Sequence, residues 1–282
     1  SQVRVWDTLI ANHLMEKNIC IPPREEHSKD TKYEGAYVKE PKLGMQHWVV
    51  SFDINSLYPH IIVQYNISPE KILGVDSSGV SVNKMLSKKT PLEFLKDKDA
   101  CITPNGAMFK RDSQGFLPEM IEKIYKDRVI YKKRELKAQR EYQKNPTNEL
   151  KKEIARCHNI QWARKIALNS CYGAIGNQYF RYYDIAQASA VTTAGQYIIR
   201  NIEQKVNEYL NQVLQTHNEI DYVLASDTDS IYVSFDKFVE KTCKNKTDQQ
   251  VCDFLAKVCD NKLEPFIAKQ FFSEEELNSN KD

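Results

Sequence analysis

Hydrophobic and polar positions along the chain follow two different periods, and the changes of period indicate the expected elements. The apolar run from Trp48 to Ile54 predicts a strand, and residues 56–64 predict a short helix with Pro59 in its first turn, where proline is tolerated. Asp53 is therefore expected at a strand-to-helix corner. Residues 1–47 show little regular pattern, and residues 19–44 within them predict a linker with turns.

Helical periodicity dominates the middle and the end of the chain. Residues 119–143 and 149–172 predict two helices, and Asn145-Pro-Thr147 between them predicts a turn, so the pair is expected to form an antiparallel hairpin. Residues 184–214 predict one long helix, and residues 249–272 predict a final amphipathic helix.

Two short β-rich runs, 222–225 and 231–234, flank the segment Ser226-Asp-Thr-Asp-Ser230. They predict a hairpin with two carboxylates near its bend. Strand, helix, paired helices, hairpin and helix follow one another in that order, which predicts an α+β fold.

The composition excludes several classes of protein. The chain has 282 residues, of which 41% are hydrophobic and 28% charged, so disorder is excluded. It has neither a membrane-length apolar run nor an apolar signal core at its N-terminus. Its seven cysteines form no Cys-x-x-Cys pair, which argues against a zinc site and indicates reduced thiols; Cys252 and Cys259 are expected to face the core. We expect a soluble cytoplasmic protein.

The net charge of +2 conceals a basic segment. Residues 119–165 carry 14 Lys and Arg but 7 Asp and Glu, a net charge of +7. Such a block is typical of a protein that binds phosphate groups. The alternative is a solvated helical face, which charge alone favours.

Three acids are the first candidates for chemistry. Asp53 and the pair Asp227 and Asp229 converge if their strands are neighbours in one sheet. Carboxylate oxygens are ligands that Mg²⁺ prefers, and a site with two ions can stabilise both the attacking and the leaving oxygen of a phosphoryl transfer. The alternative is that the Asp-x-Asp segment merely serves the turn.

Two pairs of residues are candidates for binding phosphate. Arg128 and Lys132, and likewise Lys165 and Asn169, are spaced by four positions, so each pair lies on one helix face. Arg can bind a phosphate with two hydrogen bonds. Lys supplies a positive charge, and its ammonium group could also donate a proton. Ordinary surface cations are the alternative.

Tyr58 is a candidate for recognising a sugar. A tyrosine ring beside a nucleotide would occupy the space that a 2′-hydroxyl needs, which separates DNA precursors from RNA precursors. The alternative is that Leu57 and Tyr58 are core residues.

Three ordered motifs resemble those of family B DNA polymerases. The flanking segments are similar to the members found in T-even-type bacteriophages, and the likeness extends over nearly the whole chain. The motifs are Ser51-Phe-Asp-Ile-Asn-Ser-Leu-Tyr-Pro-His-Ile-Ile62, Lys165-Ile-Ala-Leu-Asn-Ser-Cys-Tyr-Gly173 and Ser226-Asp-Thr-Asp-Ser-Ile-Tyr232, and the flanks are residues 6–10, 35–41, 66–70 and 180–184.

The resemblance implies a DNA-directed DNA polymerase. It implies a palm, made of a small antiparallel sheet with packed helices, and fingers formed by the helical hairpin. It implies two Mg²⁺ ions, with Mn²⁺ as a substitute, and it implies dNTP and primer–template DNA as partners. Asp53 and Asp229 would bind both ions with the carbonyl of Ile54, and Asp227 would tune the metal geometry.

The remaining roles also follow from the resemblance. Ser56, Leu57 and Tyr58 would line the triphosphate and sugar, with Tyr58 excluding ribose. Lys165 would be the acid for pyrophosphate departure. The β and γ phosphates would be held by Arg128, Lys132, Lys165 and Asn169, the nascent base pair would pack on Tyr172 and Gly173, and the template strand would contact the loop with Tyr33 and Gly35.

The resemblance divides the chain into five segments, from which an exonuclease and a thumb are missing. We expect either a truncated polymerase or one piece of a split polymerase whose missing parts a second polypeptide supplies. Replisome proteins such as a sliding clamp are further expected partners, a membrane is not, and the expected location is the cytoplasm of a phage-infected cell. The segments are 1–47 (end of the exonuclease and linker), 48–114 (palm), 115–177 (fingers), 178–272 (palm) and 273–282 (acidic tail).

Three features depart from the family pattern, and two other functions remain as alternatives. Ala225-Ser226 replaces an aromatic residue and glycine, His60 replaces serine, and the span from Arg128 to Lys165 is short. A non-catalytic nucleic-acid-binding module would gain only repulsion from the three acids. A two-metal nuclease would need neither the two pairs of phosphate-binding residues nor Tyr58.

Overall fold

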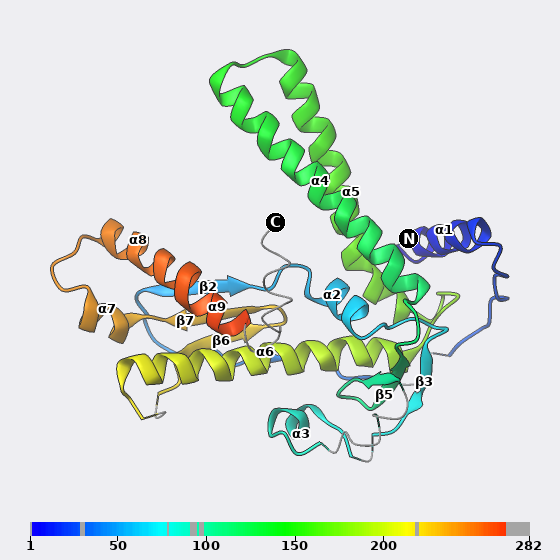
Figure 1. Ribbon diagram of the computed structural model, residues 1–282, viewed down its shortest axis with the longest axis horizontal. Coiled ribbons are helices and arrows are strands. Elements are labelled where there is room, and N and C mark those ends of the chain that lie inside the picture. Colours follow the sequence, from blue (N-terminus) through cyan, green and yellow to red (C-terminus); the bar gives the residue numbers. More distant parts are fainter. Residues whose placement is uncertain are drawn as a thin grey trace. The chain divides into compact units, whose positions relative to one another are not determined.

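The computed structural model describes residues 2–28, 32–77, 79–90, 95, 99–217 and 220–268 (Figure 1). The chain divides into two compact units, which are described here separately. The first unit comprises Ser1–Gly35 and Ser56–Gly195, and the second comprises Ala36–Asn55 and Gln196–Asp282. Helix α6, Ile185–Leu214, contributes its beginning to the first unit and the rest to the second.

The first unit begins with a helix that the sequence analysis did not expect. Helix α1, Gln2–Glu16, buries Trp6, Ile10 and Leu14, which are spaced by four residues. The indole Nε1 of Trp6 donates a hydrogen bond to the carbonyl of Ala167 at 3.0 Å, so α1 is fixed against the end of the hairpin. The expectation of a patternless start was wrong, because three apolar positions stabilise this helix only through tertiary packing.

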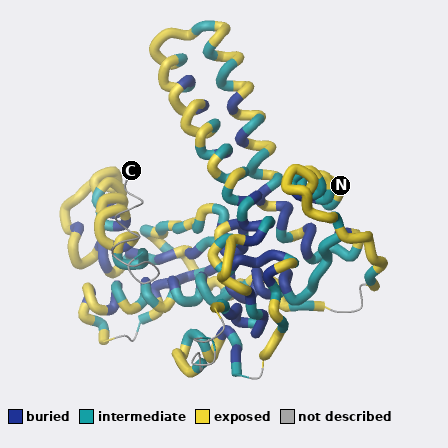
Figure 2. Tube along the Cα trace, turned by 45° about the vertical axis from the view of Figure 1, so that its right-hand side comes forward, coloured by how far each residue is buried: buried dark blue, intermediate teal, exposed yellow. Residues whose placement is uncertain are grey.

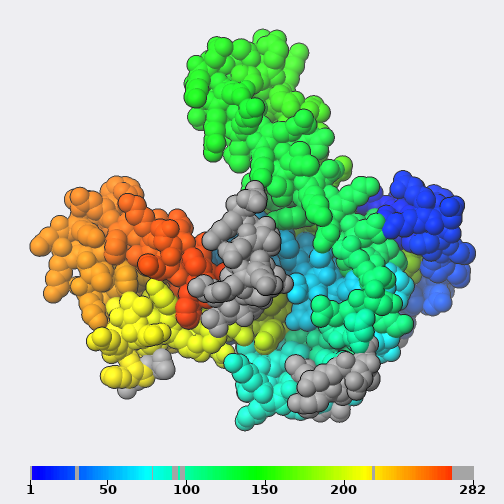
Figure 3. All heavy atoms as spheres, in the orientation of Figure 1, coloured from blue at the N-terminus to red at the C-terminus, as the bar shows by residue number. Residues whose placement is uncertain are grey.

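The expected helical hairpin is confirmed. Helix α4, Phe116–Lys144, and helix α5, Asn148–Ile175, run antiparallel, and the hydroxyl of Thr147 caps α5 by accepting from the backbone N–H of Leu150 at 3.3 Å. Between the helices, Nδ1 of His158 lies 2.9 Å from a carboxylate oxygen of Glu135. The hairpin is exposed over much of its length, and its atoms form one continuous column (Figures 2 and 3).

A short helix and a second sheet complete the first unit. Helix α2, Leu57–Gln64, buries Leu57, Ile61 and Ile62. The sheet is antiparallel with the order β3-β5-β4, and the sequence analysis did not foresee it. Its strands are β3 (Ile72–Val75), β4 (Ala100–Ile102) and β5 (Ala107–Lys110). Helix α3 (Val82–Leu86) lies between β3 and β4 in the sequence.

The second unit is built on a four-stranded antiparallel sheet with the order β1-β6-β7-β2. Apolar residues of α6 and of the last helices pack with the inward-facing residues of β6 and β7 into one core, which includes Val206, Leu210, Val223 and Val233. The strands are β1 (Val38–Lys39), β2 (Val49–Asp53), β6 (Val223–Asp227) and β7 (Ser230–Ser234).

The end of the described chain is a series of short helices. The single helix expected over residues 249–272 is replaced by α8 (Asp248–Val258), a π-helical turn (Cys259–Leu263) and α9 (Glu264–Ala268), preceded by α7 (Asp236–Thr242). Residues 269–272 of that helix and the acidic tail 273–282 lie outside the described residues.

All seven cysteines are free thiols, as expected. Cys259 is buried, but Cys252 is exposed on α8, so the expectation that both face the core was wrong for Cys252. Cys259 continues the buried stripe of Val251 and Leu255 in steps of four residues, whereas Cys252 lies outside the core that this stripe joins. No helix in the described part of the chain is long and apolar enough to cross a membrane.

The α+β class is confirmed, since long helices and two small antiparallel sheets occur in one chain. The two compact units cut across the five expected segments, and the names palm and fingers stay predictions.

Candidate active site

The acidic pair lies in a tight turn of the second unit. Strands β6 and β7 are joined by Thr228 and Asp229, and the N–H of Asp229 donates to the carbonyl of Asp227 at 2.7 Å. Thr228 has a φ of +57°, which is uncommon for a β-branched residue and costs conformational energy. This strained turn fixes both aspartates at the end of the hairpin.

Asp53 reaches the same turn from a distant part of the sequence. Strand β2 pairs with β7 so that Asp53 lies opposite Ser230, which on its other side lies opposite Asp227. The backbone N–H of Ile54 donates to the carbonyl of Asp229 at 2.8 Å. The expected convergence of the three acids at one end of the sheet is therefore present.

The electrostatics of this end suit a cation. Burial raises the pKa of Asp229, and the charges of Asp53 and Asp227 raise it further. Because burial and the two neighbouring carboxylates disfavour the ionised form of Asp229, a divalent cation would be stabilised among them. No three His, Cys, Asp or Glu side chains form a ready-made cage within the described residues. Mg²⁺ does not require such a cage, since one or two carboxylates, water and substrate phosphates usually hold it.

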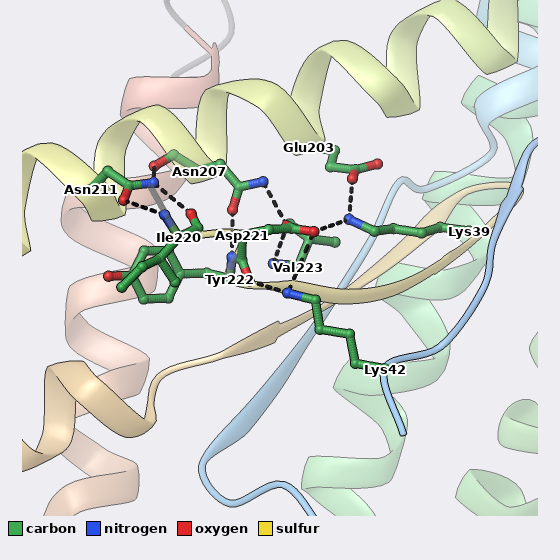
Figure 4. A network of polar contacts seen from close by, with 9 residues as sticks. All are labelled: Lys39, Lys42, Glu203, Asn207, Asn211, Ile220, Asp221, Tyr222 and Val223. Atoms are coloured by element: carbon green, nitrogen blue, oxygen red, sulfur yellow. Dashed lines mark hydrogen bonds and ion pairs between the residues drawn. The ribbon is translucent and has the colours of Figure 1, made fainter. Parts of the chain in front are cut away.

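A polar network stabilises the strand beside this turn (Figure 4). The ammonium of Lys39 on β1 binds the carboxylates of Glu203 and Asp221, the latter at 2.8 Å. Asp221 also accepts from the side chain of Asn207 at 2.8 Å and from the N–H of Val223 at 3.1 Å. Strand β1 pairs with the acidic end of β6, so the network braces the strand that carries Asp227.

The first unit contains the expected cations. Ser56, the N-cap of α2, has a φ of +56°, and its hydroxyl accepts a hydrogen bond from Nη1 of Arg128 at 3.1 Å. The side chain of Arg128 is buried, its Nε has no hydrogen-bond partner, and no carboxylate lies within 4.0 Å of it among the described residues. A buried cation without an acid is costly, so Arg128 is suited to holding an anionic group.

The second pair of expected phosphate ligands lies on α5. The ammonium of Lys165 lies 4.8 Å from the ring centroid of Trp162, a cation–π contact that the sequence analysis missed. Arg164 binds Asp127 at 3.3 Å across the hairpin, so the adjacent residues Arg128 and Lys165 are at the same level of the two helices. The other two expected ligands, Lys132 and Asn169, are exposed.

Tyrosines from the expected linker, the first motif and the second motif are in contact with one another. The rings of Tyr58 and Tyr172 lie with their centroids 4.8 Å apart, and the hydroxyls of Tyr172 and Tyr33 are hydrogen-bonded at 3.1 Å. Burial, followed by the bond to Tyr33, raises the pKa of Tyr172 well above its ordinary value. Gly35 and Gly173 are exposed. The clustering was not predicted, although one tyrosine in each of three motif regions could have suggested it.

Two of the sequence departures also have visible surroundings. The ring of His60 packs edge-on against that of Tyr125 of α4, with the ring centroids 4.7 Å apart. Nδ1 of His60 lies 2.9 Å from the carbonyl oxygen of Ser56. The hydroxyl of Ser226, directly before Asp227, is buried and has no hydrogen-bond partner among the described residues. A pocket of about 430 Å³ in the first unit, lined among others by Leu14, Phe116 and Tyr182, includes none of the expected site residues.

The comparison with known proteins now decides the family. The profile of DNA polymerase family B matches residues 1–264, which is nearly the whole chain. The chain belongs to DNA polymerase family B.

Relatives within family B include two phage enzymes and a fungal one. The DNA-directed DNA polymerase of Escherichia phage RB69 is 36% identical over 100% of this chain and 35% of its own length. That of Enterobacteria phage T4 is 33% identical over 95% of this chain and 34% of its own length. The DNA polymerase delta catalytic subunit of Candida albicans is 27% identical over 96% of this chain and 24% of its own length. The chain thus spans about a third of the length of its phage relatives.

Membership of family B implies a general need for metal ions, but it does not by itself assign a role to any residue. Family B DNA polymerases are generally dependent on divalent metal ions. The expected metal ligands Asp53, Ile54, Asp227 and Asp229 all belong to the second unit. The expected nucleotide and DNA contacts, from Tyr33 to Gly173, belong to the first unit.

Proposed function

We propose that this chain is the palm and fingers of a DNA-directed DNA polymerase. It transfers a nucleotidyl group from an incoming dNTP to the 3′-hydroxyl of a primer. The observation that carries the proposal is the convergence of Asp53, Asp227 and Asp229 at one tight turn, in a chain of family B.

The acidic turn holds the metal ions in this proposal. Asp53 and Asp229, with the carbonyl of Ile54, are the ligands of two Mg²⁺ ions, and Mn²⁺ can substitute. Asp227 adjusts their geometry from the other strand of the hairpin. When bound, such ions neutralise charge on the attacking and leaving oxygens. The strained turn at Thr228 keeps the carboxylates in place before any ligand arrives, so less reorganisation is needed on binding.

The cations of the hairpin bind the triphosphate. Arg128, oriented by the hydroxyl of Ser56, keeps its buried Nε for a phosphate oxygen. Lys165 binds the same chain of phosphates and donates a proton to the departing pyrophosphate, while Lys132 and Asn169 add hydrogen bonds. Most of the catalysis then comes from positioning and charge, as is general for phosphoryl transfer.

The tyrosine cluster recognises sugar, base pair and template. Tyr58, supported by the buried Leu57, excludes a ribose 2′-hydroxyl. Tyr172 and Gly173 pack beneath the nascent base pair, and Tyr33 and Gly35 contact the template strand. Tyr58 packs on Tyr172, and Tyr172 is hydrogen-bonded to Tyr33. These contacts support the proposal that the three tyrosines form one surface for the nucleotide and the template.

The substrates and partners of the proposed enzyme are dNTP and primer–template DNA. Further partners in this proposal are an exonuclease, a thumb and replisome proteins such as a sliding clamp. They are supplied here by the rest of a longer polymerase or by a second polypeptide.

Primer extension tests the proposal. A primed template is incubated with dNTP and Mg²⁺, first with this chain alone and then with the missing parts added. Asp229→Ala should abolish extension, because the ions lose a carboxylate, whereas Asp253→Ala on the exposed face of α8 should not. Asp253→Ala also controls for the loss of one negative charge.

Three results would contradict the proposal. Primers that shorten instead of lengthening would indicate the two-metal nuclease. DNA binding without either reaction would indicate the non-catalytic module. Extension that survives Asp229→Ala would show that the metal assignment is wrong.

A further inference from the structure

The ring of Tyr58 lies against a helix position that has no side chain. Gly195 is a buried residue of α6 in the first unit. A Cβ atom at this position would lie 3.0 Å from Cε1 of Tyr58 and 3.7 Å from side-chain atoms of Ile61 and Leu57. Carbon atoms in good contact are about 3.5–4.0 Å apart. A Cβ atom at position 195 would therefore crowd the ring, which would have to move by a few tenths of an ångström.

Glycine at this position has a cost that needs a reason. Inside a helix, glycine is less favourable than alanine by about 1 kcal/mol, because the unfolded chain loses more conformational freedom. Gly195 lies well inside the 30-residue α6. At Gly173 of α5, by contrast, a Cβ would meet nothing within 4 Å. Close packing of Tyr58 thus accounts for glycine at position 195 and for the helix stability given up there.

The other side of the same ring is also fixed. Tyr172 packs against Tyr58 with an interplanar angle of 55°, and its hydroxyl is bonded to that of Tyr33. The hydroxyl of Tyr33 in turn lies where a Cβ at Gly176 would come within 2.5 Å. Tyr58 is therefore held between the backbone of α6 and a tyrosine that is itself held in place. A ring confined in this way has little room to adjust if one side moves.

We propose that Gly195 is a specificity-determining residue that positions the ring of Tyr58. By letting the ring lie close to α6, it sets how near the ring comes to the sugar of the nucleotide. This inference rests on the proposed function, in which Tyr58 excludes the 2′-hydroxyl. A methyl group at position 195 would move the ring by a few tenths of an ångström from its seat. Steric discrimination changes by about tenfold when a pocket gains or loses the room of one methylene group.

A double-mutant cycle on Gly195 and Tyr58 tests the role in specificity. The ratio of dNTP to rNTP incorporation is measured for the wild type, Gly195→Ala, Tyr58→Ala and the double variant. Gly195→Ala should change the preference for dNTP over rNTP by up to about tenfold, because the ring no longer lies at its wild-type distance from the sugar. In the Tyr58→Ala background the same change should have no further effect, because the ring that it displaces is absent. Unchanged preference in Gly195→Ala, or an equal change in both backgrounds, would overturn the proposal.

Thermal unfolding of the same four proteins tests the contact without any need for activity. Gly195→Ala should lower the unfolding midpoint when Tyr58 is present and raise it when Tyr58 is replaced by alanine, since only the gain in helix propensity then remains. Gly173→Ala is the control for that gain and should raise the midpoint. An equal rise in both Tyr58 backgrounds would overturn the contact. If the wild type extends no primer, the proposed function fails, and this measurement still decides whether Gly195 positions the ring.

Discussion

Arg128 is a buried cation with an unsatisfied donor. Only 8% of its surface is exposed, and its one described partner is the neutral hydroxyl of Ser56. Buried guanidinium groups are normally paired with acids, because removing the charge from water is otherwise unfavourable. A triphosphate would supply both the missing charge and an acceptor for Nε. The burial of Arg128 and its unpaired Nε therefore support the proposal that it binds a phosphate group.

Arg128→Ala should weaken the use of nucleotide and spare the binding of DNA. Hydrogen bonds to charged groups contribute about 1.5–3 kcal/mol, so KM for dNTP should rise about 10- to 100-fold. Steady-state extension at varied dNTP measures this effect, and primer–template binding is measured separately. Arg156→Ala on α5, which removes an exposed cation bound to Glu153 at 2.9 Å, should change neither quantity much. A loss confined to DNA affinity would place Arg128 on the duplex.

The sequence identified the candidate residues better than their surroundings. The convergence of Asp53 with Asp227 and Asp229 could be predicted, since acids at strand ends meet when the strands pair. The spacing of Arg128 and Lys132 predicted one helix face, but not that Arg128 is buried while Lys132 is exposed. Burial depends on which element packs against the face, and here α2 supplies the hydroxyl of Ser56. That information is not contained in the spacing.

At the scale of elements, β1 is a strand of two residues that is held by backbone pairing with β6 and by side chains. Lys39 and the nearby Lys42 both bind Asp221, Lys42 at 3.4 Å. Burial raises the pKa of Asp221, but the hydrogen bonds from Lys39 and Asn207 and the charges of Lys39 and Lys42 together lower it by more, so its pKa lies below the ordinary value of 3.8. A carboxyl group with a depressed pKa stabilises the fold when ionised. That contribution is lost as the pH falls through the folded pKa.

Asp221→Ala should therefore lower the free energy of unfolding by about 1–2 kcal/mol at neutral pH. Denaturant unfolding at a series of pH values measures the difference from the wild type. The difference should shrink as the pH falls below 3.8, where Asp221 of the wild type becomes protonated. Glu208→Ala, which removes a surface ion pair with Lys205, should cost less than about 1 kcal/mol. An Asp221 effect that does not depend on pH would mean that packing, not charge, holds β1.

Long elements could be predicted and short ones could not. Helices α4, α5 and α6 contain enough turns for the period of 3.6 residues to be recognised, and the β6–β7 hairpin has turn residues between two β-rich runs. Strand β1 has two residues and β4 has three, which is too few to show any period. Their positions are fixed by pairing and by side chains such as Lys39. Helix α1 was missed for the related reason that its short apolar stripe gains stability from packing against other elements, such as α5.

At the scale of the whole molecule, charge is distributed unevenly. The chain is nearly neutral at +2, yet residues 119–165, which form most of the hairpin, carry +7. Two interpretations remain in competition. The segment either binds the phosphates of DNA or is a solvated helical face. They differ in salt dependence, because cations that contact phosphates release counterions on binding.

Replacing exposed cations of α4 by glutamine separates the two interpretations. The hairpin variant changes Lys133, Lys137, Arg140 and Lys144, all of which are exposed. If they contact DNA phosphates, primer–template affinity should fall, and the slope of log affinity against log salt should become shallower by up to about 3–4. Fluorescence anisotropy between low and moderate salt measures that slope. A solvated face would leave the slope unchanged.

A control variant makes this measurement independent of total charge. It changes four exposed lysines of the second unit to glutamine, namely Lys237, Lys244, Lys257 and Lys262. Both variants lose the same number of positive charges, so a long-range effect of net charge would weaken DNA binding equally in the two. Direct phosphate contacts would change the slope in the hairpin variant alone, because counterions are released only where a cation replaces them. Equal slopes in all three proteins would show that the basic segment does not bind the DNA backbone, and the polymerase proposal would then rest on the acidic turn and on Arg128.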